Sequence, residues 1–494
     1  MTSRRTASQK KSNAPTRAVA SKSWIARTFD ISPRYGFAMS QQPTTEDHKR
    51  TSVELFAGGG GLAMAVERAK FRPLLFNEFA KRACETLAAN VAQRVEEGGT
   101  PWIPVGKQRP PLVEGDVAKV DFEYLRGQVD VLAGGPPCQP FSLGGVGRGD
   151  EDDRNGFPHM FRAIREMRPK AVICENVRGL LRPSFKPYFD YIKRELSLPF
   201  ERRAEGSGWQ DHDAILRRLS TSSSISDDER YDVAHFPVNA ADYGVPQIRN
   251  RVIIIAFRRD LGVDFDRFRE LVRPTHSDAR LYADMDEGLY WDRHRNANIP
   301  KAVRKAVMSR IPLTTQTPLF VDGRELAPWR TLRDALLGDE ADGIPPLPDI
   351  PPHLLDRRDH WKEIAEGHWS LLVRDPKTVV TDHIGWPDAR VYHGHTPNEL
   401  DRPAKTVKAG VHGVPGGESV MLLDDGTHRY MTVRETARVM TFPDGWRLSG
   451  PRGEKMRQLG NAVPVLLGEV FANAVATVLS EAEAKVAEGV EGKD

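Results

Sequence analysis

Short apolar runs alternate with helix-like stretches from residue 51 to about residue 260. The runs have the length and the β-branched content of buried strands, and they fall at residues 53–56, 73–76, 129–133, 171–174 and 252–257. The stretches between the first of these runs are rich in Ala, Leu, Glu and Arg, which favours helices at 62–69 and 80–91. Strands that alternate with helices predict an α/β domain with a doubly wound parallel sheet, which we place at residues 51–275.

The remainder of the chain has a different pattern. Residues 276–425 are rich in Pro, Asp, Arg and His and contain few strand-like runs, which indicates a smaller, irregular second domain. Residues 432–440 and 463–479 are again helix-like and apolar enough to pack against a sheet. We therefore expect residues 426–482 to return to the first domain and residues 483–494 to form a charged tail.

Two further patterns concern exposure to solvent. Residues 201–230 include a run of Ser and Thr, lack strand or helix periodicity, and indicate a surface insertion. The longest apolar runs, such as residues 252–257, are much shorter than the ~20 residues that cross a bilayer, so no membrane segment is expected.

Positive charge is concentrated at the start of the chain. Residues 1–50 carry ten Lys and Arg against three acids, a net +7, whereas the other residues sum to −4. Because this stretch also lacks apolar periodicity, we expect a disordered basic tail at 1–50, although a phosphate-binding arm and an organelle transit peptide share its composition. A bulk charge near neutral does not indicate nucleic-acid binding, so any such evidence must come from local sites.

The three cysteines, Cys84, Cys138 and Cys174, lie too far apart for a Cys-x-x-Cys metal site or a disulfide framework. We therefore expect a reducing compartment and no bound metal. Cys84 lies in a helix-like pattern and Cys174 in a strand-like run, and both fit a structural role.

A glycine-rich turn follows the first predicted strand, with the sequence Phe-Ala-Gly-Gly-Gly-Gly-Leu-Ala at residues 56–63. Such a turn lets the backbone approach a nucleotide-type cofactor where a Cβ atom would collide. Glu78 lies 20 residues after Gly58, where a carboxylate can accept hydrogen bonds from both ribose hydroxyls. The same arrangement serves NAD and S-adenosylmethionine, so the turn alone leaves both open.

Two residues near this turn could contact an adenine. Phe79 could stack on the ring, although an aromatic beside a strand end also fits the core. Asp116 could accept from the adenine amino group, and it equally fits a turn or a helix N-cap.

A cysteine in a rigid loop is the most unusual feature of the sequence. Cys138 stands in Gly-Gly-Pro-Pro-Cys-Gln-Pro-Phe-Ser (134–142), directly after a predicted strand. Because open α/β sheets bind their ligands at the carboxyl ends of the strands, we interpret Cys138 as a nucleophile rather than a buried hydrophobe. The next strand ends at Glu175, which is expected to emerge at the same edge of the sheet, although a lone acid there is also a common cap.

A row of polar residues precedes the strand at 252–257. A period of two places Gln247, Arg249 and Arg251 on one face, where they could bind a phosphate and a base carbonyl. An exposed edge strand with ordinary charges is the alternative.

Together these motifs resemble those of the DNA cytosine-C5 methyltransferases, the enzymes that form 5-methylcytosine in bacterial modification systems and in eukaryotic chromatin. The resemblance covers most of residues 51–275 and 426–480 and rests on six motifs in order. They are Phe-Ala-Gly-Gly-Gly-Gly (56–61), Gly-Gly-Pro-Pro-Cys-Gln-Pro-Phe-Ser (134–142), Glu-Asn-Val (175–177), Gln-Ile-Arg-Asn-Arg (247–251), Arg-Glu-x-x-Arg followed by Phe-Pro (434–443) and Gly-Asn-Ala-Val-Pro (460–464).

The resemblance implies a Rossmann-like methyltransferase domain, a target-recognition domain at residues 276–425, and S-adenosylmethionine rather than NAD. The return segment of the family completes the cofactor site. The residues implied as cofactor contacts are Phe56, Ala57, Gly58, Gly60, Leu62, Glu78, Phe79, Asp116, Val117, Pro136, Asn461, Ala462 and Val463.

The resemblance also implies a catalytic role for four residues. Cys138 attacks C6 of a cytosine that has rotated out of the duplex, and C5 then accepts the methyl group. Glu175 hydrogen-bonds the N3 and amino edge of the base, Arg251 contacts its O2, and Arg249 supports Arg251 or a phosphate. Further contacts to DNA are expected from the loop after Cys138 and from the second domain, at Gln139, Ser142, Arg148, Lys405 and Thr406.

The expected function is therefore methylation of cytosine in a specific duplex DNA sequence, by a monomeric, cytoplasmic bacterial enzyme that is nucleoid-associated when on DNA. A role in restriction-modification or phage defence implies a cognate restriction endonuclease or other defence proteins as partners. Two alternatives are a tRNA cytosine-C5 methyltransferase and a catalytically silent DNA-binding homologue. The tRNA branch carries a Cys-Phe-Thr tripeptide that this chain lacks, and the joint presence of Cys138, Glu175, Arg249 and Arg251 argues against silence.

Overall fold

The computed structural model describes residues 50–137, 155–338, 345–348, 380–385, 396–409 and 419–491. All of these residues belong to one compact unit of the chain. The expected tail at residues 1–50 therefore lies outside the described residues, except for Arg50.

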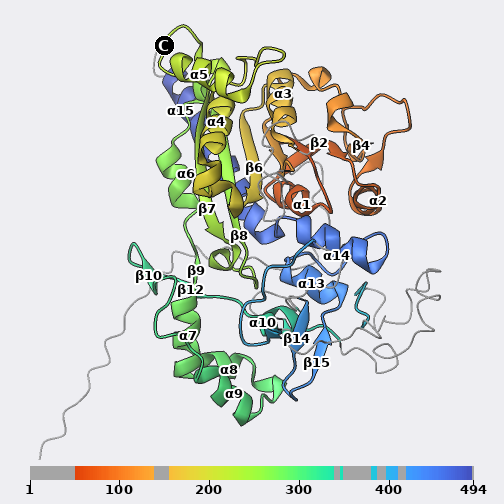
Figure 1. The fold of residues 1–494 in the computed structure, drawn as a ribbon, viewed down its shortest axis with the longest axis vertical. Coiled ribbons are helices and arrows are strands. Elements are labelled where there is room, and N and C mark those ends of the chain that lie inside the picture. Colours follow the sequence, from red (N-terminus) through yellow and green to blue (C-terminus); the bar gives the residue numbers. More distant parts are fainter. Residues whose placement is uncertain are drawn as a thin grey trace, which may run out of the picture. The chain divides into compact units, whose positions relative to one another are not determined.

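An eight-stranded sheet forms the centre of the fold, in the order β3-β4-β2-β1-β5-β6-β8-β7 (Figure 1). Only β8 runs antiparallel to its neighbours β6 and β7. The strands are β1 (Arg50–Leu55), β2 (Phe71–Glu78), β3 (Gln93–Arg94), β4 (Pro111–Glu114), β5 (Val131–Gly134), β6 (Ala171–Val177), β7 (Tyr231–Asn239) and β8 (Asn250–Arg258). All five predicted strands are present, and the prediction of a mostly parallel α/β sheet is confirmed.

The sequence did not indicate three of the strands. β3 has only two residues, and β4 is a short strand that follows Pro110. β7 contains Pro237 and is buried at few of its nine positions, so its apolar pattern is weak. It is recruited to the sheet by its antiparallel pairing with all nine residues of β8.

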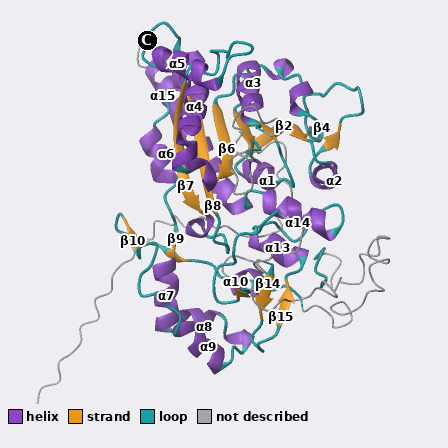
Figure 2. Ribbon diagram, in the orientation of Figure 1, coloured by secondary structure: helices purple, strands orange, loops and turns teal. Residues whose placement is uncertain are grey.

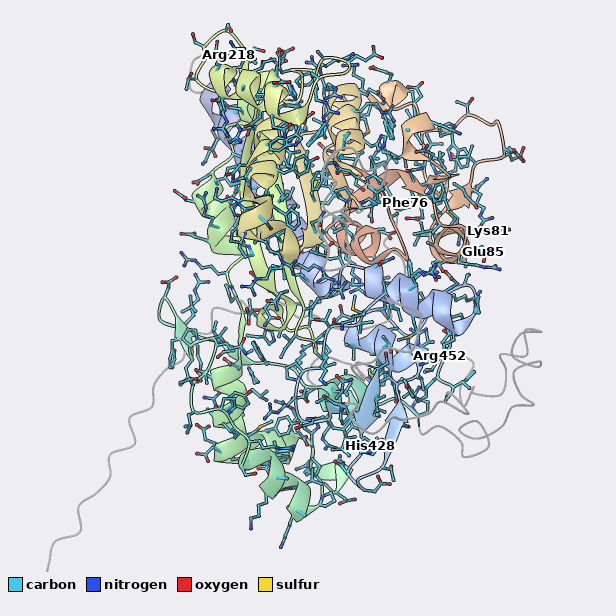
Figure 3. The ribbon with its side chains drawn as sticks, in the orientation of Figure 1. Phe76, Lys81, Glu85, Arg218, His428 and Arg452 are labelled. Carbon is cyan, nitrogen blue, oxygen red and sulfur yellow. The ribbon has the colours of Figure 1, made fainter. Side chains whose placement is uncertain are left out.

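Helices cover both faces of the sheet. α1 (Gly61–Arg68) and α2 (Lys81–Asn90) match the predicted helices within two residues at each end. α3 (Phe157–Met167) packs against α4 (Lys186–Ser197), and α1 packs against the C-terminal helix α15 (Val465–Glu491). Figure 2 shows α4 in front of β7 and β8 and α15 behind them. In Figure 3, Lys81 and Glu85 of α2 lie at the outer side of the molecule, whereas Phe76 of β2 lies further inside.

Residues 201–230 are mostly exposed, as expected for a surface insertion, but the expectation that they lack helix periodicity is wrong. This stretch contains α5 (Trp209–Leu219), which packs against α4. Leu216 belongs to the main hydrophobic core, and His212 is buried against Tyr191 at 3.1 Å between Nδ1 and the hydroxyl oxygen. The helix has only three buried positions, which explains its faint pattern.

At the carboxyl-terminal end of the chain, α15 (Val465–Glu491) packs against α1. α13 (Val433–Val439) and α14 (Arg452–Asn461) precede α15. α15 extends to Glu491, so the expected charged tail at 483–494 is mostly helix, and Glu483 pairs with Arg50 at 2.7 Å and Lys170 at 3.0 Å.

One prediction about apolar length also needs correction. The stretch Arg452–Glu488, which spans α14 and most of α15, is long and apolar enough to cross a membrane. However, 78% of its most apolar window is buried inside the protein, as in the core helix of a globular fold. Among the described residues, the apolar stretch at Arg452–Glu488 is therefore longer than the run at residues 252–257.

Between residues 276 and 425 the described residues form a helical cluster and small sheets. α7 (Asp278–Glu287), α8 (Leu289–Arg293), α9 (Lys301–Met308) and α10 (Leu332–Leu337) are helices that the composition did not indicate. Tyr290, Trp291 and Trp329 lie in a separate hydrophobic cluster there. A buried ion pair of 2.7 Å joins Arg333 to Asp401, which connects α10 to the segment at 396–409.

Candidate active site at the carboxyl edge of the sheet

The glycine-rich turn between β1 and α1 adopts the conformations that its composition predicts. Gly58 and Gly60 have positive φ angles of 55° and 88°, which favour glycine, and even Phe56 has a φ of 56°. The turn is closed by the amide of Gly60, which donates to the carbonyl oxygen of Ala57 at 3.0 Å. Gly60 is the residue before the first turn of α1, so the amides of that turn lie next to the glycines.

The C-terminal return segment encloses this turn. The indole Nε1 of Trp446 donates to the carbonyl oxygen of Gly59 at 3.1 Å. A Cβ atom on Gly60 would lie 2.7 Å from the Trp446 ring, and a Cβ atom on Gly61 would lie 2.3 Å from the carbonyl oxygen of Val463. Two of these four glycines are therefore required because the return segment approaches the backbone so closely.

Glu78, at the end of β2, fixes the turn from the other side. Its Oε2 accepts from the amide of Gly58 and its Oε1 accepts from the amide of Ala80, both at 2.7 Å. Burial raises the pKa of Glu78, although the backbone hydrogen bonds oppose this effect. Phe79 beside it is 77% exposed, so it is not a core residue, and its ring is available to a planar ligand.

The turn after β4 carries the second predicted pair of cofactor residues. Asp116 is the N-cap of the short helix η2 (Val117–Lys119) and accepts from the amide of Ala118 at 2.9 Å. The capping interpretation of Asp116 is thus realised, and its exposed side chain keeps further lone pairs for a ligand. Val117 is buried.

Sequence reasoning missed Asn77 and Glu54 at this edge. Asn77 donates from Nδ2 to the carbonyl oxygens of Val113 at 3.0 Å and Gly115 at 3.2 Å, which joins the ends of β2 and β4. Glu54 is a fully buried carboxyl on β1 whose pKa is raised by burial, and its Oε2 has no hydrogen-bond partner among the described residues. The available signal was a charged residue inside an apolar strand.

Glu175 and Arg251 meet at the same edge. Arg251 Nε lies 2.7 Å from Glu175 Oε1, and the two side chains are 12% and 10% exposed. They come together because β6 and β8 are neighbours and pair Val177 with Arg251.

The residues before Cys138 are connected to this pair. Asn176, next to Glu175, donates from Nδ2 to the carbonyl oxygen of Pro136 at 3.1 Å. The amide of Gly156 donates to the carbonyl oxygen of Pro137 at 2.9 Å, so the two described ends of the loop lie together. Cys138 itself, with Gln139, Ser142 and Arg148, lies outside the described residues.

Arg249 is fully buried and joins three distant segments. Its Nη1 donates to the carbonyl oxygen of Val407 at 3.0 Å, and its Nη2 donates to those of Gly460 at 2.7 Å and Ala462 at 2.9 Å. Burial holds the pKa of the guanidinium well below its usual value. All three acceptors are backbone carbonyls of the protein, so this side chain positions the site and is neither an exposed edge charge nor directed to solvent.

Gln247 has a related role. It is buried, accepts from the amide of Val407 at 3.0 Å, and donates to Met440 Sδ at 3.0 Å. Gln247, Arg249 and Arg251 were expected on one face. Gln247 and Arg249 are buried and bond other segments, whereas Arg251 lies beside Glu175.

Lys405 and Thr406 belong to the segment that runs beside residues 246–249. Thr406 donates from its hydroxyl to the carbonyl oxygen of Ile248 at 2.7 Å, and Lys405 donates from Nζ to the carbonyl oxygen of Thr396. Asn461, at the end of α14, is exposed, whereas Ala462 is buried. The Cβ atom of Ala462 would lie 3.2 Å from a Cβ atom added to Gly61.

Known proteins resemble this chain over most of its length. The family described as C-5 cytosine-specific DNA methylase matches residues 50–198, 216–311 and 358–477. The type II methyltransferase M.Eco47II of Escherichia coli is 31% identical over 444 residues, which cover 87% of this chain and 80% of that protein. M.NgoMIV of Neisseria gonorrhoeae is 34% identical over 433 residues, which cover 87% of this chain and 98% of that protein.

One solved structure shows the same fold. A putative DNA modification methyltransferase encoded within a prophage (E. coli) has a TM-score of 0.50 and 20% identity, and the match covers 87% of this chain and 100% of that one.

Proposed function

Because this chain belongs to the C-5 cytosine-specific DNA methylases, which methylate C5 of cytosine with S-adenosylmethionine, we propose that it methylates one short sequence of duplex DNA through a covalent bond between Cys138 and C6. The observation that carries this proposal is the Glu175–Arg251 pair at the carboxyl edge of the sheet, joined through Asn176 to the residues before Cys138. A carboxylate that can hydrogen-bond the base, a guanidinium beside it and a nucleophilic thiol suit the activation of a cytosine ring.

The residues present fit S-adenosylmethionine, which supplies an electrophilic methyl group when bound. The exposed ring of Phe79 provides a stacking surface for the adenine beside Glu78. Each carboxylate oxygen of Glu78 accepts one backbone amide and retains a lone pair for a ribose hydroxyl. Asp116 and Val117 would flank the base, and Phe56, Ala57, Gly58, Gly60, Leu62, Pro136, Asn461, Ala462 and Val463 would surround the remainder.

The proposed reaction adds a thiolate to the cytosine ring, methylates it and then eliminates the thiolate. The thiolate of Cys138 forms a bond to C6, and Glu175 hydrogen-bonds the N3 and amino edge, which favours the ring that accepts electrons. The electron pair then at C5 takes the methyl group as its bond to the donor sulfur breaks, and transfer of the C5 proton to a base with expulsion of the Cys138 thiolate restores the ring. Arg251 would contact O2 of the base while it stabilises Glu175.

The base must leave the duplex stack before Cys138 can reach C6, at a cost of a few kcal/mol. We assign the choice of sequence to residues 276–425 and the enclosure of the base to the loop that contains Gln139, Ser142 and Arg148. Thr406 would act next to the DNA by holding the 404–407 segment beside Ile248, and Lys405 would contact the DNA directly.

The relatives named type II methyltransferases support a restriction-modification or defence setting in the bacterial cytoplasm, with duplex DNA as partner. A cognate endonuclease, a monomeric state and nucleoid association are parts of this proposal. So is the division into a catalytic domain at 51–275, a recognition domain at 276–425 and a return segment at 426–482.

A fluorinated substrate tests the covalent step. A mixed-sequence duplex with 5-fluorocytosine at every cytosine cannot lose a proton from C5, so the enzyme should remain attached after methyl transfer. We expect a protein–DNA complex that survives denaturation, forms only with S-adenosylmethionine and duplex, and is absent for Cys138→Ser. Attachment to a tRNA substrate but not to DNA would contradict the assignment of the substrate.

A further inference from the structure

A pocket of about 310 Å³ lies between α3 and α4, outside the site described above. Its floor is aromatic, because Phe161 of α3 and Tyr191 of α4 line it and are buried. Its walls are charged: Arg162, Arg165 and Glu195 face it from the two helices, and Arg202 faces it from the following loop. This volume is at the lower end of the range of small-molecule sites.

The lining has an excess of positive charge. It contains four arginines and two glutamates. The guanidinium of Arg162 is paired with Glu166 at 3.0 Å. Arg165 donates to the carbonyl oxygen of Pro199 at 3.0 Å, and burial lowers its pKa despite the opposing effect of Glu195. A partly buried cation that its carboxylate neighbours do not fully compensate attracts an anion.

Glu195 gives the pocket a second kind of group. Its side chain is 5% exposed, and burial raises its pKa to about 7. Its Oε2 has no hydrogen-bond partner within the described part of the chain. A carboxyl that is half protonated near neutral pH can either donate to or accept from the polar edge of a heterocycle.

The pocket is connected to the cofactor turn and to the catalytic loop. Arg162 donates from Nη2 to the carbonyl oxygen of Val117 at 2.7 Å and from Nη1 to that of Val120 at 3.0 Å. Tyr188, which also lines the pocket, accepts at its hydroxyl from Asn155 Nδ2 at 2.6 Å. A ligand in this pocket would therefore contact residues that bond both segments, but it would not occupy the cofactor site or the catalytic site.

We infer that this pocket binds a mononucleotide, with the phosphate held by Arg165 and Arg202, the base against Tyr191, and the polar edge of the base at Glu195. Phosphate suits the arginines because guanidinium groups bind it through two hydrogen bonds at once. The aromatic floor and the single carboxyl suit a flat ring that carries both donors and acceptors. A bare anion would leave these groups unused.

Calorimetric titration tests the inference with guanosine monophosphate as the probe and protein saturated with S-adenosylhomocysteine, so that the cofactor site is filled. We expect saturable binding with one site per chain. Arg165→Gln and Arg202→Gln should each weaken it about tenfold or more, because each removes charge-assisted hydrogen bonds. Arg202 is exposed, so its substitution should leave the melting temperature unchanged.

The matched control is Arg218→Gln, which removes an exposed arginine of α5 outside the pocket (Figure 3) and should leave the affinity unchanged. Absence of saturable binding at millimolar nucleotide would overturn the inference, as would equal affinities of wild type and both pocket variants. Inorganic phosphate that binds as tightly as the nucleotide would also overturn it, because the base would then contribute nothing.

Discussion

Arg251 Nε lies 2.7 Å from Glu175 Oε1, although 76 positions along the chain separate the two residues on antiparallel neighbouring strands. The guanidinium fixes the direction of the carboxylate beside the residues that precede Cys138. A base that enters this edge would meet both groups already ordered, which lowers the entropic cost of binding it productively.

Glu175→Gln tests the carboxylate of this pair. The amide has nearly the same shape, can remain beside Arg251 and should preserve the fold, but it cannot favour the protonated ring in the same way. We expect kcat for methyl transfer to fall by about 10²- to 10⁴-fold, the range for a group that assists proton transfer. Single-turnover rates measure it. Asp190→Asn, which removes a surface carboxylate paired with Lys186, should leave the rate within a factor of two.

Arg249→Lys tests the buried connection between β8, the 404–407 segment and the return segment. Lysine lacks the fork that reaches the carbonyls of Val407, Gly460 and Ala462, and each buried carbonyl left without a donor costs about 1–3 kcal/mol. We expect unfolding at lower urea and loss of several kcal/mol of stability. Arg259→Lys just beyond the other end of β8, paired with Asp232 on the surface, should cost less than about 1 kcal/mol.

A comparison of Gly60→Ala with Gly262→Ala distinguishes the cost of backbone strain from the cost of a steric clash with the Trp446 ring. Both glycines have positive φ angles, 88° and 60°, so both substitutions carry the same kind of conformational cost. Only at Gly60 does the added Cβ atom meet the Trp446 ring at 2.7 Å, whereas nothing lies within 4 Å at Gly262. We expect Gly60→Ala to cost about 1–3 kcal/mol more and to weaken binding of S-adenosylmethionine. Equal stabilities would show that the return segment does not confine the turn.

Glu195 predicts a specific pH dependence of stability. Burial raises its pKa to about 7 from the usual value of 4.5, so the folded protein retains this proton to higher pH than the unfolded chain does. The free energy of unfolding should therefore decrease as pH rises from 4.5 to 7, by about 3 kcal/mol in total from this group.

Glu195→Gln removes this dependence. The variant should match wild type near pH 4.5 and exceed it at pH 8, as measured by urea denaturation at each pH. Glu205→Gln, an exposed control, should show the same small difference from wild type at both values. A wild-type advantage at pH 8 would mean that Glu195 is stabilised as a charged group.

The sequence predicted those elements whose signals are local. Apolar runs identified five of the eight strands, and the order of the motifs indicated both the family and the return of the last helix to the sheet. The structure places Glu78 beside the glycine turn, as expected from its spacing to Gly58.

The missing parts depend on partners far along the chain. Nothing local to Arg249 indicates that its acceptors lie 158, 211 and 213 positions away, and α5 and β7 gain their order from α4 and β8. Phe79 was ambiguous for the same reason, because exposure depends on whether any distant element covers it. Glu54 was overlooked because its burial, and the lack of a hydrogen-bond partner for its Oε2 among the described residues, depend on how distant elements pack around it.

The measurement that tests the central claim most directly is single-base mapping of methyl groups transferred from S-adenosylmethionine to mixed-sequence duplex DNA, with wild type and Cys138→Ser in parallel. We predict 5-methylcytosine within one short sequence for wild type and none for the variant, with equal affinity of the two proteins for S-adenosylmethionine. Methylation that persists in Cys138→Ser, or methyl groups on another atom or base, would contradict the assignment of Cys138 as the nucleophile.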